Sequence, residues 1–209
     1  MKIAILGAGN VGGALGEAWA RHGHEVLFGV RNPGSADLHE LLQRCGPRAR
    51  AESITDAVQF GEAVVNALPW AAVRAVLEKL ELGDKPLLDC SNPLKSDLSG
   101  LEIGTTTSAG EQVAGWAKSS KVVKIFNTTG FNNMTDPKYH GERLTMFYCG
   151  DDAAAKQVAA GLAHDIGFRP VDAGPLSNAR LLEPVASLWV WLAVHGMGRD
   201  FGFQLVKRS

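Results

Sequence analysis

The fold of this chain is decided by one stretch, Ile3-Ala4-Ile5-Leu6-Gly7-Ala8-Gly9-Asn10-Val11-Gly12. An apolar run typical of a buried strand leads into the spacing G-x-G-x-x-G, and the helical pattern Gly13 to Arg21 follows. Gly7 permits a tight turn, Gly9 lets backbone amides approach a pyrophosphate, and Gly12 lets the helix pack closely on the strand. Because unpaired N–H groups at a helix start bind anions, the stretch predicts a dinucleotide site.

The end of the second predicted strand indicates which dinucleotide is bound. A site that prefers NAD places Asp or Glu about twenty residues after the glycines, where it accepts from the ribose hydroxyls. Here Val26 to Val30 ends at Gly29-Val30-Arg31, with no acid. The guanidinium of Arg31 can hold the extra phosphate of NADP or stack on adenine. The sequence therefore favours NADP(H) over NAD, with a solvated loop arginine as the alternative for Arg31.

Apolar runs alternate with helical patterns along the first part of the chain, as a parallel sheet covered on both faces requires. The sequence predicts an α/β fold: a doubly wound, mostly parallel Rossmann-type sheet with a C-terminal α/β extension. We expect one NADP-binding domain over residues 1–209, with a core over 1–126 and the extension over 127–209. The elements expected in the core are Ile3–Leu6, Gly13–Arg21, Val26–Val30, Leu38–Arg44, a short helix capped by Asp56, Ala63–Leu68, Val73–Leu80, Pro86–Asp89, Ala109–Ala117 and Lys121–Phe126.

The extension repeats the alternation. We expect a strand over Leu144–Cys149, a helix over Asp151–Ile166 and a strand over Phe168–Asp172. An apolar stretch, Val185–Val194, is too short to span a membrane and predicts a helix in the core or in a homodimer interface. Pro184 should start or kink that helix.

Composition excludes several classes of protein. With 21 basic and 22 acidic side chains and no basic stripe, the chain does not suggest a nucleic-acid partner. The three cysteines are far apart and unpaired in sequence, which indicates neither a disulfide framework nor a metal site. A reducing, cytoplasmic location fits best. The first residues could pass for a signal peptide, but a strand, turn and helix explain them better.

Three loops follow predicted strands at the edge where open α/β sheets hold their ligands. Ala67-Leu68-Pro69-Trp70 follows the fourth strand, Asp89-Cys90-Ser91-Asn92-Pro93 the fifth, and Asn127 to Phe131 the sixth. The two prolines would stiffen loops beside the ribose and nicotinamide. For Trp70, packing in the core and contact with a ligand are equally good interpretations.

No set of residues stands out as an acid–base pair or an activated nucleophile. The histidines are isolated in sequence, no serine lies in a G-x-S-x-G elbow, and Cys90 has no obvious base. Reduction of a ketone usually needs a proton donor near the hydride, whereas hydride passage between two redox cofactors can rely on positioning. The sequence therefore favours transfer between cofactors, and we assign no catalytic residue.

At this point the chain resembles the NADPH-dependent coenzyme F-420 (F420) reductase family, whose members move hydride between NADP and a deazaflavin. The resemblance covers most of the chain. Its most specific part is the run Asp172 to Leu181, which a generic Rossmann protein has no reason to carry. It also rests on Gly7 to Gly12, Arg31, Leu68-Pro69-Trp70, Cys149 to Asp152 and His195 to Gly198.

The resemblance implies roles for particular residues. Ala8, Gly9, Asn10 and Val11 would hold the pyrophosphate. Val30 and Arg31 would meet the adenosine phosphate, and Ala67 and Phe131 would lie near the nicotinamide. The family often has Ser before the arginine and Lys a few residues later, where this chain has Val30 and Ser35. The predicted cofactor-binding set is Gly7, Ala8, Gly9, Asn10, Val11, Gly12, Val30, Arg31, Ser35, Ala67, Leu68, Pro69, Asn92 and Phe131.

The runs Asp89 to Leu94 and Phe126-Asn127-Thr128 are more similar to the NADPH-binding domains of metalloreductases, which pass hydride to a flavin. The second redox partner is therefore F420 or a flavin, a small-molecule acceptor in either case. Alternatives are a flavin or ferric reductase, a reductase of small imines or carbonyls, and an NADPH-binding sensor or subunit without turnover.

Overall fold

Ten strands form the sheets of the computed structural model, which describes residues 1–118 and 121–208. Eight of them make one sheet, in the order β10-β9-β6-β5-β4-β1-β2-β3, and β7 and β8 form a separate hairpin. The strands are β1 (Lys2–Leu6), β2 (Glu25–Gly29), β3 (Ala49–Glu52), β4 (Ala63–Asn66), β5 (Leu87–Asp89), β6 (Val122–Lys124), β7 (Lys138–Tyr139), β8 (Glu142–Arg143), β9 (Thr145–Gly150) and β10 (Arg169–Asp172).

The first six strands run parallel, in the spatial order 3-2-1-4-5-6 that defines the Rossmann fold. Only the pairing of β6 with β9 is antiparallel within the large sheet, and β10 then runs parallel to β9. The expectation of a doubly wound, mostly parallel sheet is confirmed.

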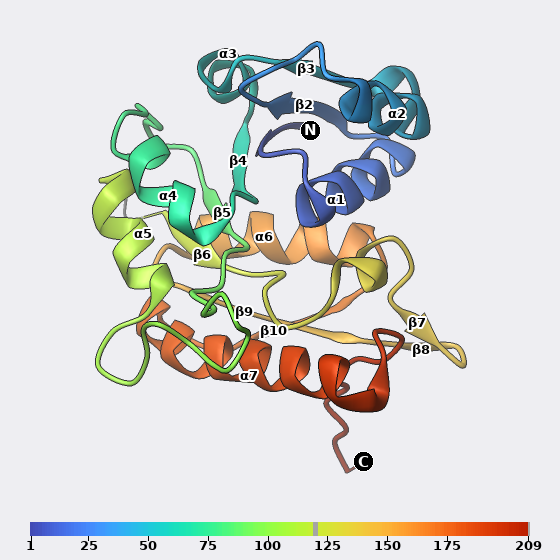
Figure 1. Ribbon diagram of the computed structural model, residues 1–209, viewed down its shortest axis with the longest axis vertical. Helices are drawn as coiled ribbons and strands as arrows, with labels where there is room; N and C mark the ends of the chain where they lie inside the picture. The colour runs from blue at the N-terminus through green and yellow to red at the C-terminus, as the bar shows by residue number, and fades with distance from the viewer. Residues whose placement is uncertain (119–120, 209) are drawn as a thin grey trace.

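Helices follow most strands and cover both faces of the sheet (Figure 1). The expected helix over Ala109–Ala117 has these bounds in the structure, and the other expected helices shift at their ends. The α-helices are α1 (Asn10–Arg21), α2 (Ala36–Cys45), α3 (Ile54–Phe60), α4 (Trp70–Leu77), α5 (Ala109–Ala117), α6 (Ala153–Asp165) and α7 (Ala179–Leu192). Short 3-10 turns span Gly46–Arg48, Phe131–Met134 and Leu176–Asn178, and a π-helical turn spans Ala193–Met197.

Successive side chains of each central strand point into two apolar cores, one on each face of the sheet. Ile3 and Ile5 pack with residues of α1, α2 and α6, whereas Ala4 and Leu6 pack with residues of α3, α4 and α5. This alternation follows from the two-residue period of a strand. Because both faces are covered, the central strands read as continuous apolar runs, which is why the sequence predicts them well.

The extension completes the sheet instead of forming a separate layer. Its strand β9 lies beside β6, β10 follows at the edge, and α7 (red in Figure 1) runs along them. On the opposite face, the indole Nε1 of Trp19 in α1 donates to the carbonyl oxygen of Leu162 in α6 over 3.0 Å. Residues of both segments thus share one core.

The structure changes three expectations about element ends, of which one, the cap of α3, is wrong. Asp56 does not cap α3: the Ser53 side chain caps it, accepting from the amide of Asp56. Pro184 does not start α7, which begins at Ala179 and contains the proline in its interior. The helix expected over Val185–Val194 is present with other ends, because α7 ends at Leu192 and the π-helical turn follows.

Two features were absent from the expectation. Strand β3 carries Arg50 and Glu52 on its exposed positions, so it lacks an apolar run. The β7–β8 hairpin is only two residues long on each side. In the described part of the chain, no helix has both the length and the apolar character needed to cross a membrane.

Candidate functional site

The glycine-rich turn joins β1 to α1 and leaves the helix start open. Gly7 has φ of 97°, a conformation that favours glycine, and its amide donates to Gly29 O over 3.0 Å. Gly9 is the N-cap residue of α1, and no side chain caps that helix. A Cβ added at Gly9 would have no atom within 4 Å, so the space beyond the helix start is clear. The backbone N–H groups there suit a pyrophosphate.

Gly12 has a different task. A Cβ at this position would lie 2.2 Å from Gly7 O and 3.2 Å from the Cβ of Ala67. Only glycine therefore lets α1 pack against the turn and against the end of β4. The packing task predicted for Gly12 agrees with these distances.

Arg31 lies two residues after the end of β2 and is exposed. Among the described residues, no ion pair or hydrogen bond of the Arg31 side chain occurs. Asn32 turns the chain, accepting from the amide of Gly34 through Oδ1, and Ser35 precedes α2. The guanidinium is thus available to an anionic ligand.

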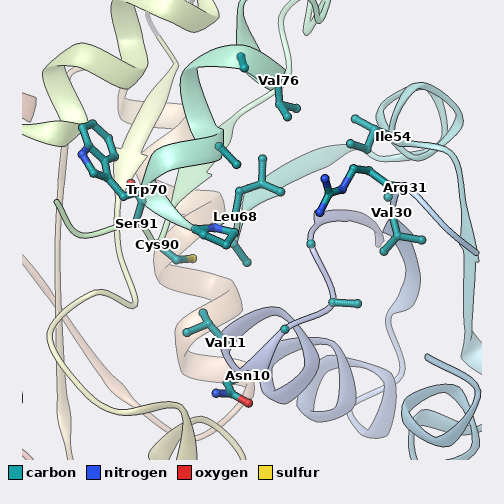
Figure 2. Close-up of a pocket in the computed structure, with 18 of the residues that line it drawn as sticks. Asn10, Val11, Val30, Arg31, Ile54, Leu68, Trp70, Val76, Cys90 and Ser91 are labelled. Carbon is teal, nitrogen blue, oxygen red and sulfur yellow. The ribbon is translucent and has the colours of Figure 1, made fainter. Parts of the chain in front are cut away.

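A cavity of about 820 Å³ connects these features. Figure 2 shows Arg31, Val30 and Ile54 at one end, Trp70, Cys90 and Ser91 at the other, and Leu68 between them. Its volume falls in the range of about 300–1,000 Å³ typical of ligand sites. The cavity is lined by Gly7, Ala8, Gly9, Asn10, Val11, Gly29, Val30, Arg31, Asn32, Ser35, Ile54, Ala67, Leu68, Pro69, Trp70, Ala72, Ala75, Val76, Cys90, Ser91, Asn92 and Leu94.

The structure brings all the predicted cofactor-binding residues to this cavity except Gly12 and Phe131. Gly12 lies behind the turn, for the packing reason given above. Phe131 lines a second cavity of about 340 Å³ that shares Ala8, Gly9 and Asn10 with the first. Both interpretations of Trp70 stay open, because it lines the large cavity and packs on Trp116 with ring centroids 5.2 Å apart.

The loops after β5 and β6 are joined by an amide pair. Asn92 Nδ2 donates to Asn127 O over 2.9 Å, and Asn127 Nδ2 donates to Asn92 Oδ1 over 3.1 Å. Phe126 precedes this pair with φ of 61°, in the left-handed region. Such strain persists in a non-glycine residue only where the surroundings impose it. The pair fixes Asn92 at the rim of the cavity.

Beneath the loop after β5 lies a buried ionic cluster that the sequence analysis missed. Lys124, Asp89 and Glu183 have side chains at most 1% exposed. Lys124 Nζ lies 2.8 Å from Asp89 Oδ2 and 3.0 Å from Glu183 Oε1. Burial lowers the pKa of Lys124, but the two carboxylates outweigh it and the pKa is raised. The lysine is therefore charged at neutral pH.

Part of this cluster was visible in the sequence. Asp89 was placed at the carboxyl end of β5, and Lys124 interrupts the apolar run of β6. Two opposite charges inside adjacent buried strands indicate a pair. Glu183 carries no such signal, because it lies in a distant helix.

The three thiols are unreactive by their surroundings. All are free and buried, and burial raises the pKa of Cys45 to about 11 and of Cys149 to about 12. Burial also raises the pKa of Cys90, which lines the cavity, with the adjacent Asp89 adding to the effect. A thiol that stays protonated is a poor nucleophile. In the described residues, no group of His, Cys, Asp and Glu is placed to hold a metal ion.

The fold and the cavity together define a nucleotide-binding protein of the Rossmann class. The sequence matches the family described as NADP oxidoreductase, coenzyme F420-dependent, over residues 2–93. It is 27% identical over 222 residues to the F420-dependent NADP reductase of Methanocaldococcus jannaschii, with 99% of each chain covered. A solved structure from Arthrobacter sp. FB24, provisionally described as an F420-dependent NADP-reductase, has a TM-score of 0.87 at 32% identity, covering 99% of this chain and 100% of that one.

The chain belongs to the family of coenzyme F420-dependent NADP oxidoreductases. The likeness to metalloreductases is also present: the rat metalloreductase STEAP3 is 28% identical over 188 residues. That match covers 88% of this chain but 36% of the metalloreductase, so it concerns one part of that protein.

Proposed function

We propose that this oxidoreductase binds NADPH along the large cavity and exchanges hydride with F420, a deazaflavin. The observation that carries the proposal is the continuity of the cavity from Arg31, past the open start of α1, to Ser91 and Asn92. A dinucleotide has a phosphate-bearing adenosine, a pyrophosphate and a nicotinamide in that order. The cavity has a cation, free amides and the neutral residues Ser91 and Asn92 in the same order.

The residues divide the binding task. Arg31 receives the phosphate on the adenosine ribose through charge-assisted hydrogen bonds. Backbone amides at Gly9, Asn10 and Val11 receive the pyrophosphate at the positive end of α1. The nicotinamide half then lies toward Ser91 and Asn92. The family relatives support F420 as the second partner, since the Methanocaldococcus protein is named for it.

When bound together, the two cofactors supply the chemistry, a hydride passing from one ring to the other. The protein contributes orientation. The side chains that line the cavity are mainly apolar, and its titratable groups are Arg31 and the protonated thiol of Cys90. An apolar wall excludes water from a reactive hydride donor. This composition suits transfer between two cofactors better than reduction of a ketone, which needs a proton donor.

The proposal is tested with purified protein and a panel of acceptors. NADPH oxidation, followed by its absorbance, should accelerate on addition of F420 and should be much slower with FMN or FAD. Turnover with the flavins and none with F420 would replace the deazaflavin assignment by the flavin reductase alternative. Binding of NADPH without turnover by any acceptor would instead favour the sensor alternative.

A homodimer is the second part of the proposal. The outer face of α7 and its π-helical turn exposes Leu181, Leu188, Trp191, Val194 and Met197, each about half exposed or more. The two charged side chains of α7, Arg180 and Glu183, both bind elsewhere, to Glu111 and to the buried cluster. An apolar face without charge of either sign suits contact with its own copy. The free, buried thiols agree with a reducing, cytoplasmic location.

Light scattering on a sizing column tests this interface. Leu188→Glu should convert a dimer to a monomer, because it places two like charges in an apolar contact. Val206→Glu is the matched control, since Val206 is exposed but lies outside α7. A wild-type protein that is monomeric at all concentrations would contradict the proposed dimer.

A further inference from the structure

Three strands present polar side chains in one row at the carboxyl edge of the sheet. Asn66 of β4 is paired in register with Asp89 of β5, and Asp89 is paired with Lys124 of β6. All three are fully buried. Asn66 Nδ2 donates to Asp89 Oδ1 over 2.8 Å, and Lys124 Nζ binds Asp89 Oδ2. A polar row inside an apolar core is costly unless it is fully paired.

All three N–H donors of Lys124 are used by neighbouring buried groups. Its ammonium has three N–H donors, which meet Asp89 Oδ2, Glu183 Oε1 and the backbone oxygen of Ser91. No donor is left for a ligand. The lysine therefore acts on the site through its partners.

Ser91 is the partner that reaches the cavity. Its amide and its hydroxyl both donate to Asp89 Oδ1, over 3.1 Å and 2.7 Å, and its carbonyl oxygen accepts from Lys124. Every polar group of Ser91 is thus committed to Asp89 or Lys124. The residue next to it, Asn92, is the one paired with Asn127.

Glu183 connects this arrangement to the extension. It lies in α7, and its carboxylate accepts from the amides of Ala109 over 2.9 Å and Gly110 over 3.0 Å at the start of α5. The carboxylate is 1% exposed and does not line the cavity. One side chain therefore binds the start of α5 and Lys124 together.

We propose that Lys124 and Glu183 are positioning residues that hold Ser91 and the following loop for the nicotinamide half of the dinucleotide. This inference rests on the proposed binding of NADPH, because it assigns the Ser91 end of the cavity to that half. The adenosine half lies at the other end, on Arg31, and shares no contact with the cluster. Disturbing the cluster should therefore weaken binding of the nicotinamide half and leave binding of the adenosine half unchanged.

Glu183→Gln is the sharpest test, because Glu183 touches neither the cavity nor the cofactor. An amide has the same shape but replaces one oxygen by NH₂. One orientation places that NH₂ against the ammonium of Lys124, and the other places it against the amide of Ala109. Both orientations remove the negative charge that Glu183 presents to Lys124. The Kd of NADPH and the kcat with F420 should each worsen about tenfold, as for a misplaced reactive group.

The discriminating ligand is adenosine 2′,5′-bisphosphate, which has the phosphate for Arg31 but no nicotinamide. Its Kd should stay within about twofold of the wild-type value, because it does not reach the Ser91 end of the cavity. A twofold change in Kd is well under 1 kcal/mol. Equal weakening of both ligands would show general damage and would overturn the proposal. Unchanged NADPH binding and kcat in Glu183→Gln would also overturn it.

Arg180→Met is the matched control. Arg180 also ties α7 to α5, through Glu111, but contacts neither Lys124 nor Ser91. It should leave both ligands and kcat unchanged. Loss of NADPH binding in this variant would show that any loosening of α7 weakens NADPH binding. That result would contradict a specific role for the cluster.

Lys124→Met gives the larger change, because it leaves two buried carboxylates without their cation. If that variant does not fold, Glu183→Gln alone decides the question. Failure of the proposed function would be recognised separately. It would appear as a wild-type protein that binds no NADPH or does not oxidise it with F420, before any variant is compared.

Discussion

The two ends of the cavity are built in different ways. At one end Arg31 is exposed, with no ion pair among the described residues. At the other end Ser91 is buried, and its amide, hydroxyl and carbonyl groups all bind Asp89 or Lys124. One end offers a single exposed charge, and the other offers a surface held by hydrogen bonds.

This difference suits the two tasks that a dinucleotide sets. Choosing between NADP and NAD depends on one phosphate, which a flexible guanidinium can bind without precise support. Hydride transfer depends on the placement of a ring, where an error of about 1 Å can cost about 10²-fold in rate. The buried charges therefore lie under the end where geometry matters more.

Gly9→Val should have the largest effect, because it acts on the turn that both ends share. The new side chain meets no protein atom within 4 Å of its Cβ, so the fold should remain. It would fill the space above the start of α1 and should weaken NADPH by about 10²-fold, since anion binding there needs close approach of the backbone. Calorimetric titration measures the Kd, and thermal melting checks the fold.

Gly12→Val is the contrasting control on the same turn. Its Cβ would clash with Gly7 O at 2.2 Å, so it should lower Tm strongly, unlike Gly9→Val. Wild-type affinity for NADPH in Gly9→Val would show that the pyrophosphate binds elsewhere.

Arg31→Glu should affect ligand binding at the exposed end of the cavity only. A carboxylate repels the ribose phosphate but accepts from ribose hydroxyls. The affinity for NADPH should therefore fall by about 10–100-fold, and the affinity for NADH much less. Kd values for both nucleotides, measured at one salt concentration, give the comparison. Arg50→Glu is the matched charge reversal, because Arg50 lies over the Phe60 ring and not at the cavity. Equal losses for NADPH and NADH would show that Arg31 does not discriminate between them.

The exposed end could be predicted from the sequence because its signals are local. The glycine spacing and Arg31, two residues after β2, lie within about thirty positions, in the order that the fold requires. The loops after β4 and β5 were also found, because buried parallel strands are continuous apolar runs and ligands collect at their carboxyl ends.

The complete cluster under the buried end could not be predicted, because Glu183 joins Asp89 and Lys124 only in the folded chain. Glu183 reaches Lys124 from α7, far away in sequence, and a single acid in an apolar helix gives no hint of its partner. Local errors had local causes. Asp56 was chosen as a cap where Ser53, three residues earlier, makes the bond. Pro184 was expected to start or kink the helix, and it does not start it, because Ala179 to Glu183 already form the first turns of α7.

Arg180→Met should have the smallest effect and separates the exposed link between α5 and α7 from the buried one. Arg180 binds Glu111 through Nε and Nη2, with both side chains partly exposed. Solvent screens such a pair, so its loss should lower Tm by only about 1–2 °C and leave NADPH affinity unchanged.

The difference in Tm between wild type and Arg180→Met should depend on pH, and the direction of that dependence tests the ion pair. The hydrogen bond from Arg180 lowers the pKa of Glu111 below its ordinary value of 4.5 in the folded protein. The pair therefore stabilises the protein fully above pH 4.5, and the contribution is lost as pH falls through the lowered pKa. The Tm difference between wild type and Arg180→Met should be constant near neutral pH and should shrink in acid. A difference that persists below the lowered pKa would mean that Arg180 stabilises α7 through packing of its alkyl chain, since the charge of Glu111 would then be gone.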